Sequence, residues 1–142
     1  TGQPSLPNTD LDTIRTEMVE RINDVRMQHG AQVLRIDDRL MAAAQECADK
    51  HYTWHHDLEE CEAVARSGYP YGFGINLTVF TLCPSDHVAE QAVENWVNSP
   101  GHFRTMTVSD GDSIGVGVAR DNGVTYCYII VGRPGTYNPY GA

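Results

Sequence analysis

The sequence predicts an α+β fold, a three-layer α-β-α sandwich around a mainly antiparallel central sheet. Several segments of the first two thirds repeat apolar residues at spacings of three and four, which is typical of helices with one buried face. The last third instead holds two strand-like runs, 113–119 and 124–131. Because the second run is apolar on both faces, we expect helices to cover both faces of the sheet.

Two long helices are expected first. One begins after the cap candidates Asn8, Thr9 and Asp10, ends before Gly30, and carries the apolar residues Leu11, Ile14, Met18, Ile22 and Val25. A second runs from about Asp37 to His51. Its apolar face is made mostly of small residues, which allow close packing against a neighbour: Leu40, Ala43, Ala44, Cys47 and Ala48.

Shorter elements follow. Residues 58–67 are expected to form a helix that stops at Gly68, and residues 72–80 lead from a loop into a strand. A further helix, capped by Ser85 or Asp86, should run to Asn98 with a buried face of Val88, Ala92, Val93 and Trp96. The break at Pro100-Gly101 should then place His102 outside the helix, at the mouth of a cleft.

The C-terminal third predicts a β-hairpin. Asn122-Gly123 between the two apolar runs is a strong signal for a tight turn with left-handed backbone angles. Gly115 and Gly117 fall on one face of the first strand, where they would admit a closely packed neighbour. Residues 134–142 are expected to be extended surface chain.

Length and charge limit the function. The 142 residues fit one domain, here divided into an extension (1–10), the domain proper (11–133) and a tail (134–142). The net charge of −9, without any Lys/Arg cluster, argues against nucleic-acid binding. Without an apolar run of about 18 residues we expect no transmembrane segment, and we expect a monomer.

The four cysteines show no CxxC pair, which favours disulfides over a zinc knuckle, and hence secretion. Linking Cys61 to Cys83 would close a loop of about 20 residues and leave Cys47 to pair with Cys127. Three connectivities are possible, and four free thiols are the alternative.

Short motifs along most of the chain resemble one known family. They are Asn23-Asp24-Val25-Arg26, Gly30, Leu34, Asp37, Leu40, Ala44-Gln45, Ala48, His51, Gly74, Asn76-Leu77, Trp96 through His102, and Ile114-Gly115-Val116-Gly117. In this order they resemble the CAP (SCP/TAPS) domain of cysteine-rich secretory proteins, venom antigen 5 and plant pathogenesis-related class 1 proteins. The compact Asn-Ser-Pro-Gly-His form resembles the bacterial branch, which implies a secreted or cell-surface protein.

The resemblance implies a cavity with two histidines and two acidic residues, which binds zinc or another divalent cation in some members. His102 matches the second histidine, and His55, with His56 as the alternative, matches the first. The two glutamate positions hold Ile75, beside Asn76, and Ser99. With both carboxylates missing, we expect at most weak metal binding.

Other groups can complete or border the cleft. An acidic side chain from elsewhere would restore a ligand if it folded inward, and the candidates are Asp57, Glu62, Glu90 and Glu94. Trp54 and residues 69–73 form either an aromatic rim or part of the core.

The leading hypothesis is a secreted CAP domain that is not an enzyme. It would act as a ligand-binding or interaction module whose degenerate cleft binds an extracellular protein, glycan or lipid. One alternative is a metal-dependent hydrolase or protease that activates water between His55 and His102. The other is capture of a lipid or sterol, with Ile75 enlarging an apolar groove.

Overall fold

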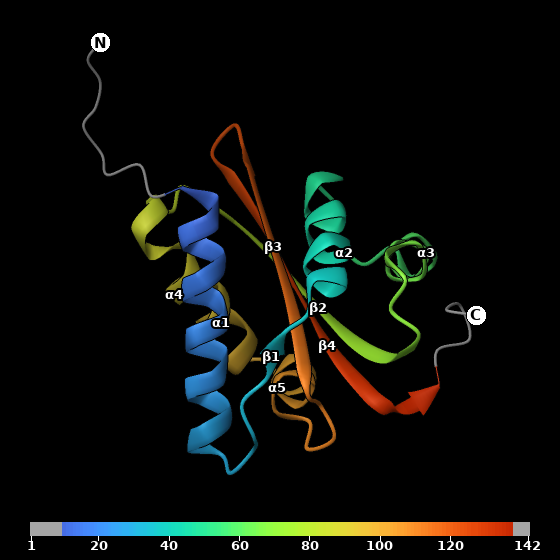
Figure 1. Ribbon diagram of the computed structural model, residues 1–142. Helices are drawn as coiled ribbons and strands as arrows, with labels where there is room; N and C mark the ends of the chain where they lie inside the picture. Colours follow the sequence, from blue (N-terminus) through green and yellow to red (C-terminus); the bar gives the residue numbers. More distant parts are fainter. Residues whose placement is uncertain (1–9, 138–142) are drawn as a thin grey trace.

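The computed structural model describes residues 10–137 and places one sheet between two layers of helices (Figure 1). The strands lie in the order β1-β3-β4-β2. Their bounds are Arg35–Ile36 for β1, Tyr71–Thr81 for β2, Ser113–Asp121 for β3 and Val124–Tyr137 for β4. The short β1 pairs parallel to β3, whereas β4 pairs antiparallel with both β3 and β2. The sheet is therefore mixed and mainly antiparallel, which confirms the predicted fold class.

Within residues 10–137, three α-helices cover one face of the sheet and two cover the other (Figure 1). The first layer holds α1 (Leu11–Gln28), α4 (Val88–Val97) and α5 (Pro100–Thr107). The second holds α2 (Asp38–Asp49) and α3 (Asp57–Ser67). Along β4, side chains alternate between the layers, so Cys127 and Ile129 pack towards α1 and α4 while Tyr128 packs with α2 and α3. That alternation delivers Tyr128 to the candidate site.

The chain packs most closely where α2 crosses β3. A Cβ added at Gly115 would lie 2.0 Å from the backbone of Leu40, and one at Gly117 would lie 2.3 Å from the carbonyl oxygen of Ala44. Gln45 fixes this contact, because its side chain donates to the carbonyl of Val118 and accepts from the Val118 amide. The predicted close neighbour of the two glycines is therefore confirmed.

Several local predictions are also confirmed. Asp10, one of the three cap candidates, caps α1 by accepting from the amide of Thr13, Gly68 ends α3 with φ of 91°, and Asn122-Gly123 forms the left-handed turn between β3 and β4. The predicted cap at Ser85 or Asp86 is wrong, because these residues form a 3₁₀ turn, η1 (Ser85–His87), and α4 starts after His87 without a side-chain cap.

The region after Trp96 also differs from the prediction. Pro100 does not release His102 from helical structure but begins α5, with Ser99 at its N-cap. Proline suits the first helical position because no helix partner exists there for the amide hydrogen it lacks. His102 is therefore held in the first turn of a helix. The predicted domain boundary at residue 133 falls inside β4, and residues 1–9 and 138–142 lie outside the described part.

The predicted disulfides do not form, because all four cysteines are free thiols. Cys47 packs in the α2/α3 layer and Cys127 in the α1/α4 layer, so the sheet separates them. Cys61 lies on α3, whereas Cys83 packs against the core of the opposite layer. With no disulfide in the structure, the cysteines no longer argue for an oxidising compartment.

Replacing Gly117 by alanine should lower the free energy of unfolding by about 1 to 3 kcal/mol, because the new methyl group must push α2 away from β3. Urea unfolding followed by circular dichroism measures the change. Gly135→Ala is the matched control, since an added Cβ there meets nothing within 4 Å. Equal stability of the two variants would contradict the close packing.

Thiol titration should separate the cysteines into two classes. Cys61 and Cys83 are half-buried and should react first. Cys47 and Cys127 are buried, and burial raises both pKa values, that of Cys47 to about 12, so they should react only on unfolding. Fewer than four reactive thiols in an unfolded, unreduced sample would show that a disulfide forms after all.

Candidate functional site

The candidate site is built around the carboxylate of Glu60, on the buried face of α3. Glu60 shares this face with Ala63 and Val64 and is only 1% exposed. The hydroxyl of Tyr128, on β4, donates to Oε2 of Glu60 at 2.6 Å. A buried carboxylate needs such donors, because burial without them would strongly disfavour its charged form.

The segment before α3 supplies the other donors. Nδ1 of His55 lies 2.9 Å from Oε1 of Glu60, and the backbone amide of His56 donates to Oε2 at 3.2 Å. Burial raises the pKa of Glu60, but the hydrogen bonds from His55 and Tyr128 outweigh it and the net pKa is lowered. The hydrogen bond to Glu60 in turn raises the pKa of His55. Burial and the carboxylate raise the pKa of Tyr128, which keeps its proton.

This pairing determines which nitrogen of His55 can meet a ligand. With Nδ1 bound to Glu60, Nε2 is the nitrogen left for a ligand or proton. The side chain of His55 is 35% exposed. It borders a cavity of about 290 Å³ lined by His55, Asp57, Glu60, Cys61, Phe73 and Ile75.

His55, Asp57 and Glu60 also form a cluster of potential metal ligands. One ligand atom from each lies within 4.8 Å of the others. Both carboxylates lie in the first turn of α3, where Asp57 is exposed and Glu60 is buried. The cluster therefore joins one imidazole to two carboxylates at the edge of the cavity.

The predicted second histidine, His102, lies outside that cluster. Its Nδ1 is 2.9 Å from Oγ of Ser99. Burial, together with the charge of His55, lowers the pKa of His102, so the two imidazoles interact electrostatically. Asn76 is buried and donates to the carbonyl of His102 at 2.8 Å, which ties α5 to β2.

His55 rather than His56 joins the site. The His56 ring stacks on Tyr52, with ring centroids 3.7 Å apart, and its Nδ1 lies 3.0 Å from the carbonyl oxygen of Trp54. Neither contact involves the cavity, whose lining includes His55 and the predicted Ile75 but not His56.

Sequence reasoning missed Glu60 and considered other acidic residues. Of these, Asp57 lies in the cluster, whereas Glu62, Glu90 and Glu94 are exposed. One signal was present in the sequence. Glu60 precedes Ala63 and Val64 at spacings of three and four, which places it on the buried face of its helix.

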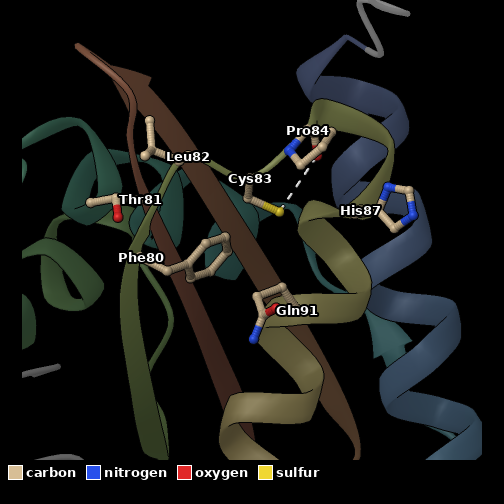
Figure 2. A pocket seen from close by; sticks show the side chains of 7 residues that line it. All are labelled: Phe80, Thr81, Leu82, Cys83, Pro84, His87 and Gln91. Atoms are coloured by element: carbon tan, nitrogen blue, oxygen red, sulfur yellow. Dashed lines mark hydrogen bonds between the residues drawn. The ribbon is translucent and has the colours of Figure 1, made fainter.

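A second cavity of about 380 Å³ lies between the end of β2 and the start of α4 (Figure 2). Its lining combines apolar Phe80, Leu82 and Pro84 with polar groups. The Cys83 thiol donates to the carbonyl of Pro84, and burial raises its pKa. Nδ1 of His87 instead lies 3.0 Å from Asp86. These contacts do not form a Cys-His nucleophile pair.

Comparison with known families matches residues 19–132 to the model of the CAP, or cysteine-rich secretory protein, family. The chain belongs to the CAP family. Membership of this family supports, in general terms, a role in binding a ligand or a partner. Members of the family are often extracellular. No curated protein sequence matches the chain significantly.

Solved structures share the CAP fold at low identity. A cysteine-rich secretory protein from Staphylococcus aureus has a TM-score of 0.73 and 17% identity, over 94% of this chain and 43% of the other. An outer surface protein of Borrelia burgdorferi has a TM-score of 0.69 and 22% identity, over 89% of this chain and 96% of the other. NaASP2, solved with Zn²⁺, has a TM-score of 0.69 and 14% identity, over 96% of this chain and 93% of the other. The chain thus spans less than half of the Staphylococcus aureus protein.

Within residues 10–137 no helix has the length and apolar character to cross a membrane.

The His55–Glu60 pair should give the metal-free protein a defined pH profile of stability. Glu60 has a lowered pKa, so its contribution is full above the ordinary value of 4.5 and is lost as pH falls through the lowered one. His55 has a raised pKa, so its contribution is full below 6.5 and is lost as pH rises through the raised value. The unmodified protein should therefore be more stable than Glu60→Gln, and this difference should be largest at a pH between the two ordinary pKa values.

Thermal unfolding at a series of pH values measures that advantage. Glu62→Gln, which changes an exposed carboxylate of the same helix, is the control and should follow the unmodified protein. An advantage over Glu60→Gln that stays flat with pH would contradict the pairing.

Proposed function

We propose that this CAP domain is an extracellular or cell-surface binding module whose ligand site is the cavity at His55, and that His55 and Asp57 hold a divalent cation there. The observation that carries the proposal is the cluster of His55, Asp57 and Glu60 within 4.8 Å. The names of the outer-surface and secretory relatives support the location.

The donor set fits a cation such as zinc. Imidazole nitrogen and carboxylate oxygen are both zinc ligands. Glu60 already accepts hydrogen bonds from His55, Tyr128 and the His56 amide, so its role is to orient His55 as a carboxylate partner does in metal sites. With only His55 and Asp57 as direct ligands, the cation is weakly held and keeps open positions. A bound cation would polarise an oxygen atom of the ligand.

A binding role demands less of His55 than a catalytic one. The hydrolase alternative is supported by the His55–Glu60 hydrogen bond, which would orient a general base. The same bond leaves only Nε2 of His55 available, however, and one nitrogen cannot both hold the cation and accept a proton. The raised pKa of His55 means that the cation competes with a proton for this nitrogen, so cation binding should strengthen as pH rises. Capture of a lipid or sterol stays a separate prediction, for which Phe80, Leu82 and Pro84 of the second cavity offer apolar surface.

Zinc titration of the metal-stripped protein by calorimetry tests the proposal. Zinc should bind the unmodified protein, and His55→Ala and Asp57→Asn should each abolish most of the heat. Glu60→Gln should weaken binding roughly 10- to 100-fold because His55 loses its orienting partner. His102→Ala should have a smaller effect, since His102 lies outside the cluster.

Glu59→Gln is the matched control, because Glu59 is an exposed carboxylate of the same helical turn. An absence of heat with the unmodified protein would refute the cation site. Equal affinity in His55→Ala would refute its ligands.

A further inference from the structure

Three aromatic rings are stacked on the segment that joins α2 to α3. Tyr52 and His56 have ring centroids 3.7 Å apart and planes inclined by 17°. Trp54 is nearly parallel to His56, with 9° between planes and 6.2 Å between centroids. We call Tyr52, Trp54 and His56 the ring stack. These alternate residues share one side of the segment, while His55 between them is bonded to Glu60.

The ring stack is open to solvent at Trp54 but held in place. Trp54 is 70% exposed, whereas the other tryptophan, Trp96, is fully buried. The His56 ring is fixed by the carbonyl of Trp54 and the His56 amide by Glu60. Contiguous aromatic surface that is exposed and held by a fixed backbone is typical of binding sites.

The surrounding charges restrict what can bind. Asp57, which follows His56 in the chain, is exposed, and Nζ of Lys50 lies 6.0 Å from the centroid of the Tyr52 ring. The chain as a whole carries a net charge of −9. Stacking of nucleic-acid bases on aromatic rings normally accompanies a positively charged groove, and the sequence holds no Lys/Arg cluster to form one. Anionic ligands are therefore disfavoured. The ligand needs a flat apolar face for the rings and hydrogen-bond donors for carboxylates.

A neutral sugar ring meets both needs, because its C–H face is apolar and its rim carries hydroxyl donors. We propose that the ring stack binds a neutral saccharide chain. One sugar ring lies on the open face of Trp54, and its hydroxyl groups donate to Asp57 at the edge of the cavity. This goes beyond the cation site. The two sites share Asp57, but none of the three rings is a proposed cation ligand.

Titration with two neutral tetrasaccharides, cellotetraose and the β-1,4-linked tetramer of N-acetylglucosamine, tests the proposal. Binding should change the fluorescence of Trp54, with buried Trp96 as a constant background. Trp54→Ala should weaken binding by about tenfold or more, as loss of a central aromatic contact does, and Trp54→Phe should retain most of it. Leu82→Ala, at an exposed apolar residue on the second cavity, is the control and should bind normally.

The same titrations are run with a chelator and with zinc. Binding in chelator that depends on Trp54 supports the ring stack even if the cation site fails. The proposal would be overturned if neither tetrasaccharide bound at millimolar concentration, or if Trp54→Ala bound them as well as the unmodified protein does. Binding of an acidic control alone, such as a hyaluronan tetrasaccharide, would also overturn it. Circular dichroism of each variant confirms that it is folded.

Discussion

The buried carboxylate of Glu60 is the constraint on which the site depends. A charge at this depth is tolerated only when hydrogen-bond donors surround it. The donors are three groups from two places: the Tyr128 hydroxyl on β4, and the His55 ring and His56 amide before α3. One side chain thereby fixes α3 against the sheet and holds His55 and His56 in place. That arrangement turns His55 to the cavity and His56 into the ring stack.

This constraint also changes how the cleft is understood. The family resemblance places an acidic residue on the strand, where this chain has Ile75. Ile75 and Glu60 line the same cavity, so a carboxylate is present there but comes from α3 instead of β2. Its three hydrogen bonds make it an orienting group for His55 more than a free ligand. A weak cation site and a binding role both follow from that chemistry.

Features encoded locally were predictable, and features that depend on the third dimension were not. The cap at Asp10, the Asn122-Gly123 turn and the close approach at Gly117 need only neighbouring residues or strand periodicity. The predicted pairing of the cysteines was wrong because the sequence does not show which face of the sheet each cysteine occupies. Glu60 was missed because a charged residue on an amphipathic helix is usually at the surface, and its partner Tyr128 is 68 residues away.

The most direct test of the account is the histidine side-chain spectrum by nitrogen-detected NMR across a pH titration, for the metal-free protein and for Glu60→Gln. His55 should titrate above its ordinary pKa with the proton retained on Nδ1, and Glu60→Gln should lower this pKa. An unchanged titration of His55 in Glu60→Gln would contradict the claim that Glu60 organises the site.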